Sequence, residues 1–267
     1  PPRSTLFPYT TLFRSLRRVK NRHPHGKGFK VSPLKIATYN VNSLRSRLHV
    51  VLPWLQKQQP DIFCMQETKV EDAKFPAADF EGMGYTVSFR GNKQYNGVAV
   101  ASRQKPDAVS FGLNDDPADP DRLAAVRFGN LTVINVYVPQ GQEVDKPQFA
   151  YKLNWLARLK MLLEKHYRPD ENLILCGDFN VAPTPIDVHD PKRILGHVSF
   201  NPQVWKAYED LLSWGLVDVF RKHHPEKPGQ YTFFDYRIRD SVGRNLGWRV
   251  DHRSEERRVG KECRSRW

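Results

Sequence analysis

The stretch Leu173-Ile174-Leu175-Cys176-Gly177-Asp178-Phe179-Asn180 joins a short apolar run to a carboxylate and an amide. Its apolar residues are too few for a helix and of the type found in a buried strand. Alternation along an extended chain places Asp178 and Asn180 on the same side, and the prolines that follow favour a loop. The sequence therefore predicts a strand that delivers two polar groups at its carboxyl end. An Asx-turn, in which the same residues only shape the backbone, is an equal alternative.

The same pattern recurs along the chain. Four further predicted strands carry a polar residue at or beside their carboxyl end: Asn40 after residues 34–39, Glu67 at the end of 61–67, Tyr137 within 131–138 and Asp251 at the end of 247–251. We expect these side chains to meet at one edge of the fold.

Two long amphipathic segments predict helices. Apolar residues recur at helical spacing over 44–55, after Ser43, which we expect to cap the helix. Residues 146–166 carry an apolar stripe that is typical of core packing, and Lys152 and Arg158 fall outside this stripe.

The remaining predicted elements define the fold class. Strands are expected over 84–89, 97–101, 123–128 and 131–138, then a helix over 202–214 and strands over 216–220 and 231–236. A run of strands without intervening helices suits antiparallel ladders. We therefore predict an α/β fold with two facing mixed, mainly antiparallel sheets and outer helices.

The two ends of the chain bear an unusual relation to each other. The segments Thr5 to Ser15 and Arg253 to Cys263 can be encoded by the two strands of one nucleotide string, residue for residue. Such a string resembles a sequencing adapter read through at both ends of a DNA fragment. We therefore predict that residues 1–15 and 253–267 are non-native and that the natural sequence ends at or near His252.

Residues 16–33 are basic, polar and interrupted by proline and glycine, which is typical of a disordered segment. They are either an arm that contacts DNA or upstream DNA translated in frame. We favour the second interpretation, because the first methionine is Met65 and Val31 can serve as a non-AUG start. The formal net charge is +13, yet residues 31–252 carry 28 Lys and Arg against 26 Asp and Glu. Net charge therefore says little about a nucleic-acid partner.

The body, residues 34–252, has the length of one large domain. It shows no repeat, no linker and no apolar run near the roughly 20 residues that a membrane span needs. Cys64 and Cys176 each lie in an apolar, strand-like run, which is typical of reduced core cysteines rather than of a zinc site. We expect a single soluble domain, monomeric and cytoplasmic, that does not bind a membrane.

The polar residues at the strand ends form a set of oxygen donors. Asn40, Glu67, Asp178, Asn180 and Asp251 suit Mg²⁺, or Mn²⁺, far better than zinc. Mg²⁺ is usually held by one or two carboxylates together with water and the phosphate oxygens of a substrate. The sequence has neither a phosphate-binding Gly-x-x-x-x-Gly-Lys loop nor a serine nucleophile elbow. It therefore predicts metal-dependent hydrolysis of a phosphate ester.

Six short segments occur in an order that points to a family. They are Ile36–Arg45 (IATYNVNSLR), Gln66–Lys69 (QETK), Tyr95–Ala99 (YNGVA), Asn135–Gly141 (NVYVPQG), Gly177–Asn180 (GDFN) and Gly247–His252 (GWRVDH). This set, which extends over the body from Leu34 to His252, resembles the bacterial exodeoxyribonuclease III / AP endonuclease family of the endonuclease/exonuclease/phosphatase superfamily. The resemblance implies a four-layered α/β sandwich. It also implies Mg²⁺-dependent cleavage of double-stranded DNA, from 3′ ends or at abasic sites, in base excision repair.

The resemblance also implies roles for individual residues. Glu67 matches the metal ligand of the family, and Asn40 matches the neighbour that helps to set the metal and the general base. Asp178 matches the aspartate that orients or deprotonates the attacking water. Asn180 matches a donor to the phosphoryl oxygen, and Tyr137 matches a tyrosine that contacts the phosphate or the leaving group.

The remaining implied residues lie around this group. Asp251 matches an aspartate that the family places in the active site. Gln140, Lys93 and Asn96 match positions that contact DNA. Taken alone, each residue also has an ordinary structural explanation, such as a turn-forming asparagine or a strand aromatic.

One part of the family pattern is missing. The family carries a C-terminal Ser-Asp-His motif whose histidine stabilises or protonates charge at the phosphate. The chain reaches its adapter-like segment before such a motif, and His252 belongs to the earlier Gly247–His252 segment. We therefore expect that the last strand region is missing, that a neighbouring strand is partly unpaired, and that this polypeptide is weakly active or inactive.

Two other classes of function stay open on sequence alone. One is another phosphodiesterase or phosphatase of the superfamily, such as a phosphoinositide phosphatase, a sphingomyelinase or a secreted nuclease. The other is a catalytically dead DNA-binding module, which would bind duplex DNA without metal and without cleavage.

Overall fold

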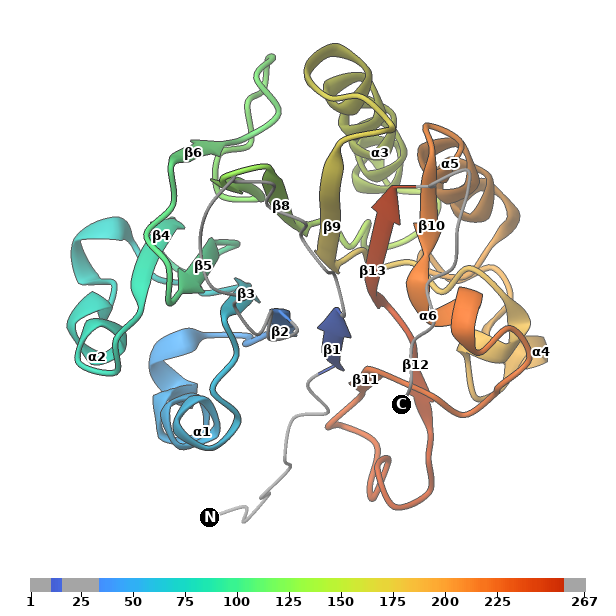
Figure 1. Ribbon diagram of the computed structural model, residues 1–267. Helices are drawn as coiled ribbons and strands as arrows, with labels where there is room; N and C mark the ends of the chain where they lie inside the picture. The colour runs from blue at the N-terminus through green and yellow to red at the C-terminus, as the bar shows by residue number, and fades with distance from the viewer. Residues whose placement is uncertain (1–10, 16–33, 257–267) are drawn as a thin grey trace.

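The computed structural model describes residues 11–15 and 34–256. The predictions made for residues 16–33, 1–10 and 257–267 lie outside the described residues. The body forms two facing sheets with helices on both outer sides (Figure 1).

The strands lie close to their predicted bounds where the apolar pattern in the sequence is long. The first sheet has the order β1 (Thr11–Ser15), β2 (Leu34–Asn40), β3 (Ile62–Gln66), β5 (Val98–Ser102) and β4 (Thr86–Arg90). The second has the order β10 (Leu216–Asp218), β13 (Asp251–Glu256), β9 (Asn172–Asp178), β8 (Leu131–Tyr137), β7 (Leu123–Phe128) and β6 (Ala108–Phe111). A small pair consists of β11 (Phe233–Phe234) and β12 (Gly247–Trp248).

Six α-helices lie within the described ranges. They are α1 (Leu44–Gln58), α2 (Ala77–Glu81), α3 (Pro147–His166), α4 (Pro191–Ile194), α5 (Pro202–Leu212) and α6 (Val219–His223). Two 3₁₀ turns also lie in these ranges: η1 (Asp72–Lys74) and η2 (Pro185–Asp187). No helix in these ranges is both long and apolar enough to cross a bilayer.

Strand alternation produces four layers, as predicted. On β3, Ile62 and Cys64 point into the core between the sheets, whereas Phe63 and Met65 pack outward against α1 and α2. On β9, Ile174 faces the same inner core, and its neighbours on the strand pack outward against α3 and α5. Each sheet therefore buries both of its faces.

The two sheets contain one parallel pair each. β2 runs parallel to β3, and β8 runs parallel to β9, while the other pairings are antiparallel. The carboxyl ends of both parallel pairs lie at the same edge of the sandwich, because Asn40 on β2 contacts Asp178 on β9. This edge collects the polar residues that the sequence places at strand ends.

A polar cluster inside the apolar core connects the sheets near that edge. Gln66 Nε2 donates to Thr38 Oγ1 at 2.9 Å and to Asn135 Oδ1 at 2.6 Å. Asn135 Nδ2 in turn donates to the carbonyls of Met65 and Ala99. Because buried polar groups need partners, these contacts set how the second sheet sits on the first.

Several predictions about local structure were wrong. Ser43 makes no side-chain cap on α1, because its backbone has φ 83 and its hydroxyl contacts Ser46 instead. The predicted strand over 216–220 ends at Asp218, whose carboxylate accepts from Arg221 N and caps α6. The strand expected over 231–236 is reduced to Phe233–Phe234.

Two further predictions were incomplete. The run of strands has no intervening helix, as predicted, but it also contains β6, which the sequence pattern did not indicate. The strand expected over 247–251 is divided between β12 and β13.

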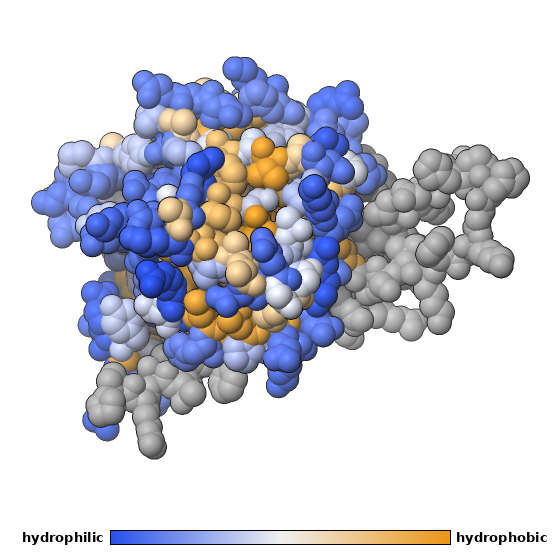
Figure 2. Space-filling view, turned by 90° about the vertical axis from the view of Figure 1, so that its left-hand side faces the viewer, coloured by the Kyte–Doolittle hydropathy of each residue, from blue (hydrophilic) through white to orange (hydrophobic). Residues whose placement is uncertain are grey.

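The expected unpaired strand is not found in the described part of the chain. Residues 11–15 pair as β1 along Leu34–Thr38 of β2, and residues 253–256 continue β13 between β9 and β10. The non-native origin of these residues stays a prediction. The edge strands are β1 and β4 in the first sheet and β10 and β6 in the second. β4 and β6 lie on the side of the molecule that Figure 2 shows, where apolar residues gather in the centre.

Gly177 lies where β8 and β9 approach each other closely, which leaves no room for a side chain. It has φ +135, and a Cβ atom there would lie 2.1 Å from the carbonyl oxygen of Val136. Gly129 also has a positive φ, of +58, but a Cβ atom there meets nothing within 4 Å. We expect Gly177→Ala to lower the free energy of unfolding by about 1–3 kcal/mol more than Gly129→Ala in urea denaturation, since only the first variant forces the strands apart. Equal losses would show that β8 moves freely.

Candidate active site

The polar residues predicted at strand ends lie together on the inner face of the sandwich. Tyr137 and Asp178 are register partners on β8 and β9, and Asp178 and Asp251 are register partners on β9 and β13. Side chains opposite each other in a ladder share a face. The second sheet therefore presents a row of tyrosine, aspartate and aspartate toward the end of β2 and β3.

Asn40 connects this row to the first sheet. Its Nδ2 donates to Glu67 Oε1 at 2.7 Å and to Asp178 Oδ2 at 2.8 Å. Its Oδ1 accepts from the backbone N–H of Asn42 at 3.0 Å, which fixes the direction of the amide. One side chain thus holds two carboxylates that come from different sheets.

Asp178 and Asn180 are brought together by a turn rather than by alternation. The strand ends at Asp178, and Asn180 has φ 51. Asp178 Oδ1 accepts from the backbone N–H of Asn180 at 2.8 Å, and Asn180 Nδ2 donates to the carbonyl of Val138 at 2.9 Å. The Asx-turn alternative and the clustering of polar groups are therefore both present.

The buried carboxylates repel each other. Burial raises the pKa of Asp178 well above its usual range, the charges of Asp251 and Glu67 raise it further, and the hydrogen bond from Asn40 opposes the shift. Burial raises the pKa of Asp251 to about 6, against the effects of Thr232 and His252. Burial, together with the charges of Glu67 and Asp178, also raises the pKa of Tyr137, so its hydroxyl is held in the protonated form.

The cluster has more negative than positive charge. Lys69 Nζ lies 2.7 Å from Glu67 Oε2 and also donates to Asn42 Oδ1. Asp251 Oδ1 is buried without a hydrogen-bond partner. No group of three or more His, Cys, Asp and Glu side chains in the described ranges has the spacing of a metal centre. These donors fit a divalent cation such as Mg²⁺, which uses few protein carboxylates and takes water and phosphate oxygens as further ligands.

His252 does not face this cluster. Its Nε2 lies 2.7 Å from the carbonyl oxygen of Val181, and its Nδ1 lies 2.9 Å from Arg249 Nη1. Arg249 also binds Asp187 and Asp218, so the ring belongs to a buried ionic network behind the site. This position agrees with the expectation that His252 is not the histidine of the Ser-Asp-His motif.

The predicted DNA-contacting residues lie around the cluster rather than in it. The carbonyl of Asn96 accepts from Lys69 N, and its side chain donates to Asp121. Gln140 is exposed just after β8, and Lys93 is exposed in the loop before Asn96. None of the three contacts the carboxylates directly in the described hydrogen bonds.

Comparison with known families agrees with this geometry. The model of the Endonuclease/Exonuclease/phosphatase family matches residues 37–252, which include every residue of the cluster. The chain belongs to the endonuclease/exonuclease/phosphatase family.

Relatives within this family are nucleases. The chain is 34% identical over 242 residues to exodeoxyribonuclease III of Haemophilus influenzae, covering 86% of this chain and 90% of that protein. It resembles the structure of an AP endonuclease from Archaeoglobus fulgidus with 52% identity and a TM-score of 0.81, over 84% of this chain and 86% of that one. A 3′–5′ exonuclease from Neisseria meningitidis gives 40% identity and a TM-score of 0.78, over 83% and 86%. The chain is therefore an exodeoxyribonuclease III-like hydrolase.

Three cationic residues beside the site have no role in the prediction from sequence. Lys69 was quoted in a motif without a role, although it pairs with Glu67. Arg122 was not considered, and its guanidinium lies 4.9 Å from the ring centre of Tyr137. Lys152 was placed outside the apolar stripe of its helix, yet it is 0% exposed. Only the position of Lys69 next to Glu67 offered a signal in the sequence.

The repulsion among carboxylates predicts how stability depends on pH. Because the pKa of Asp251 is raised in the folded state, the folded protein binds the proton more tightly, and the free energy of unfolding falls as pH rises from about 4 through about 6. We expect Asp251→Asn to stabilise the metal-free protein by about 1–2 kcal/mol at pH 7.5 and by much less at pH 4.5, measured by urea denaturation in EDTA.

The exposed Asp210 provides a matched control. It pairs only with Lys206 on the surface of α5, so Asp210→Asn should change stability little at either pH. If Asp251→Asn had the same effect at both pH values, the pKa of Asp251 would not be raised in the folded protein.

Proposed function

We propose that the chain is a Mg²⁺-dependent DNA phosphodiesterase that acts on double-stranded DNA, removing nucleotides from 3′ ends and cutting at abasic sites. The observation that carries the proposal is the contact of Asn40 with both Glu67 and Asp178 at the meeting point of the two sheets. This contact brings Glu67, the proposed metal ligand, next to Asp178, the proposed general base. The names of the relatives supply the substrate class.

Asp178 is the proposed base that orients and deprotonates the attacking water. Its two oxygens are held by Asn40 Nδ2 and Asn180 N, which leaves a fixed carboxylate with its remaining lone pairs toward the site. The raised pKa of this carboxyl group makes it a stronger proton acceptor than an exposed aspartate. Asp251 is the proposed neighbour that maintains this shift.

Asn180 and Tyr137 are the proposed donors to the phosphate. The amide of Asn180 donates to the carbonyl of Val138 at 2.9 Å and makes a longer contact of 3.4 Å with Asp178 Oδ2, which a phosphoryl oxygen would replace. The Tyr137 hydroxyl keeps its proton and can therefore donate to a phosphoryl or leaving-group oxygen. Donors that are held in place before the reaction stabilise charge as it develops.

Glu67 and Asn40 are the proposed residues that hold Mg²⁺, with Mn²⁺ as a substitute. When bound, the cation would polarise the phosphate and offset the negative charge of the cluster. Asp251 Oδ1 has no hydrogen-bond partner, and the pKa values of Asp251 and Asp178 are raised. Both observations support a cation at this cluster, because it would offset the negative charge.

The loops beside the cluster form the proposed DNA-binding surface. Tyr95, which is 70% exposed, lies between Lys93 and Asn96 in a loop whose backbone contacts Thr68 and Lys69. On the other side, Thr232 Oγ1 accepts from Asp251 N, and the chain then enters an exposed loop rich in arginine. That loop carries Tyr236 at 73% exposure. Basic and aromatic groups suit phosphates and bases.

A cleavage assay tests the proposed function. We expect the protein, in excess over labelled duplex DNA that contains one abasic site, to cut the DNA with Mg²⁺ and to stop when EDTA is added. Glu67→Gln and Asp178→Asn should each lower the single-turnover rate by about 10²–10⁴-fold, because they remove a metal ligand and a general base.

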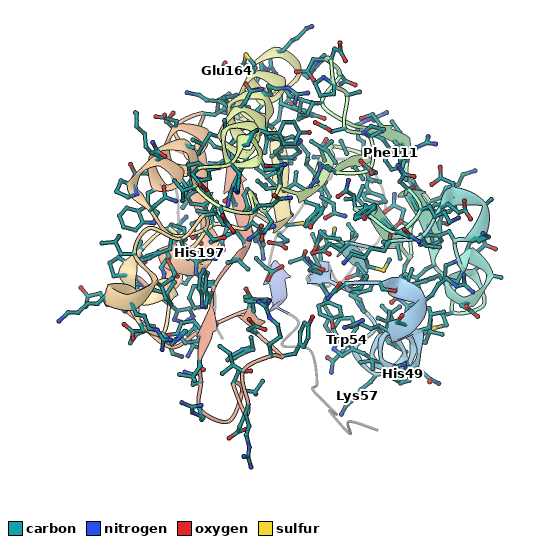
Figure 3. All side chains as sticks on the ribbon, turned by 180° about the vertical axis from the view of Figure 1, so that it is seen from behind. His49, Trp54, Lys57, Phe111, Glu164 and His197 are labelled. Atoms are coloured by element: carbon teal, nitrogen blue, oxygen red, sulfur yellow. The ribbon has the colours of Figure 1, made fainter. Side chains whose placement is uncertain are left out.

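The control variant is Glu164→Gln. Glu164 lies on α3 far from the site edge and pairs with Lys160 on the surface (Figure 3). Its variant should cleave within about twofold of the unmodified chain. Absence of cleavage of abasic-site and 3′-ended duplexes with both Mg²⁺ and Mn²⁺, even by a folded chain whose C-terminal Ser-Asp-His segment has been restored, would contradict the proposed function.

A further inference from the structure

Lys152 lies on α3 with a buried ammonium group, whose hydrogen bonds go to backbone carbonyl oxygens. Its Nζ donates to the carbonyls of Asn180 at 2.7 Å, Val198 at 2.8 Å and Gln140 at 3.2 Å. An ammonium group has three N–H donors, so each donor has one acceptor. The side chain is 0% exposed.

The three carbonyls belong to three separate segments. Gln140 follows β8 and lies three positions after Tyr137, and Asn180 follows β9 and is itself one of the proposed phosphate donors. Val198 lies between α4 and α5. Lys152 therefore joins the exits of the two central strands of the site to a third loop.

The segments also contact one another directly, since Ala182 N donates to the carbonyl of Ser199 at 2.8 Å. An open pocket of about 470 Å³ lies beside them and is lined by residues 142–145 and 196–198. Figure 3 shows His197 on this side of the molecule, close to the C-terminal elements. Lys152 adds to these contacts a single group that binds all three segments at once.

Gly141 allows the first segment to close over the lysine. It has φ +97, and a Cβ atom there would lie 3.2 Å from Lys152 Cδ. A side chain would both strain the backbone and press on the lysine. The glycine and the lysine thus form one local unit.

A buried ammonium group carries a cost that the fold has to offset. Burial lowers the pKa of Lys152 to about 7, and the negative charge of Asp178 opposes this shift. A neutral, apolar side chain would avoid the cost but would leave three buried carbonyls without a donor. The ammonium group therefore supplies a donor to each of the three carbonyls, which an apolar side chain cannot do.

We propose that Lys152 is a positioning residue, whose ammonium group fixes the exits of β8 and β9 so that Asn180 and Tyr137 keep their places beside the phosphodiester. This inference rests on the proposed function for its catalytic consequence, but not for its structural one. A displacement of about 1 Å in a catalytic group lowers the rate by roughly 10²-fold.

The test compares Lys152→Met with Arg158→Met. Arg158 is a second buried cation on the same helix, but it binds Asp115, Asp119 and the carbonyl of Pro117, away from the carboxylate cluster. Hydrogen–deuterium exchange is measured on residues 139–143, 178–182 and 196–200 of the full chain. Single-turnover cleavage of abasic-site duplex DNA is measured well below the unfolding temperature of each variant, and DNA affinity is measured in EDTA.

We expect Lys152→Met to raise exchange in all three segments and to lower the cleavage rate by about 10–100-fold, while DNA affinity changes by less than about threefold. Arg158→Met should lose stability but leave the three segments and the rate per folded molecule unchanged. Unchanged exchange in 178–182 and 196–200 for Lys152→Met would overturn the inference, as would an unchanged rate.

Gly141→Ala keeps the inference testable if Lys152→Met does not fold. Because the added methyl group presses on Lys152, exchange should rise in 178–182 and 196–200, which contain no substitution. A change confined to 139–143 would overturn the inference. If neither the unmodified chain nor a chain with a restored Ser-Asp-His segment cleaves DNA, the proposed function fails, whereas the exchange measurements still decide the role of Lys152.

Discussion

Electrostatic repulsion among Glu67, Asp178 and Asp251 is the constraint on which the rest of the structure depends. Three carboxylates at one buried edge are unfavourable unless neighbouring groups offset their charge. The amide of Asn40 binds two of them, and Lys69 binds Glu67. Burial, together with the remaining repulsion, raises the pKa of Asp178 and Asp251 and prepares the site for a cation and for a proton.

The arrangement requires two sheets that meet in one register. Neither sheet holds the site alone, since Asn40 and Glu67 come from the first and Asp178 from the second. The buried contacts of Gln66 with Thr38 and Asn135 tie the sheets together one step below the site. A slip of either sheet would leave these groups unpaired inside the core, so the core polar cluster and the site are maintained by the same alignment.

Much of this fold was predictable because its elements are strongly periodic. The apolar alternation of β3 and β9 and the long stripe of α3 mark elements whose bounds agree with the structure within one or two residues. Short elements were not predictable in the same way. β6 is mostly exposed, and α6 begins at a cap formed by Asp218, so neither has an apolar period to read.

The sequence by itself determined that Asn40, Glu67, Tyr137, Asp178 and Asp251 stand at strand ends, because strand alternation and chain order are local properties. Only the tertiary structure decided that they meet, since their contacts join residues as far apart as Asn40 and Asp178. It also decided where charge is buried. Lys152 and Arg158 look like solvent-exposed residues on a helical wheel, but the loops that cover them come from elsewhere in the chain. The sequence of residues 173–180 thus predicts a strand and a turn, and the packing of the two sheets brings these residues into a site.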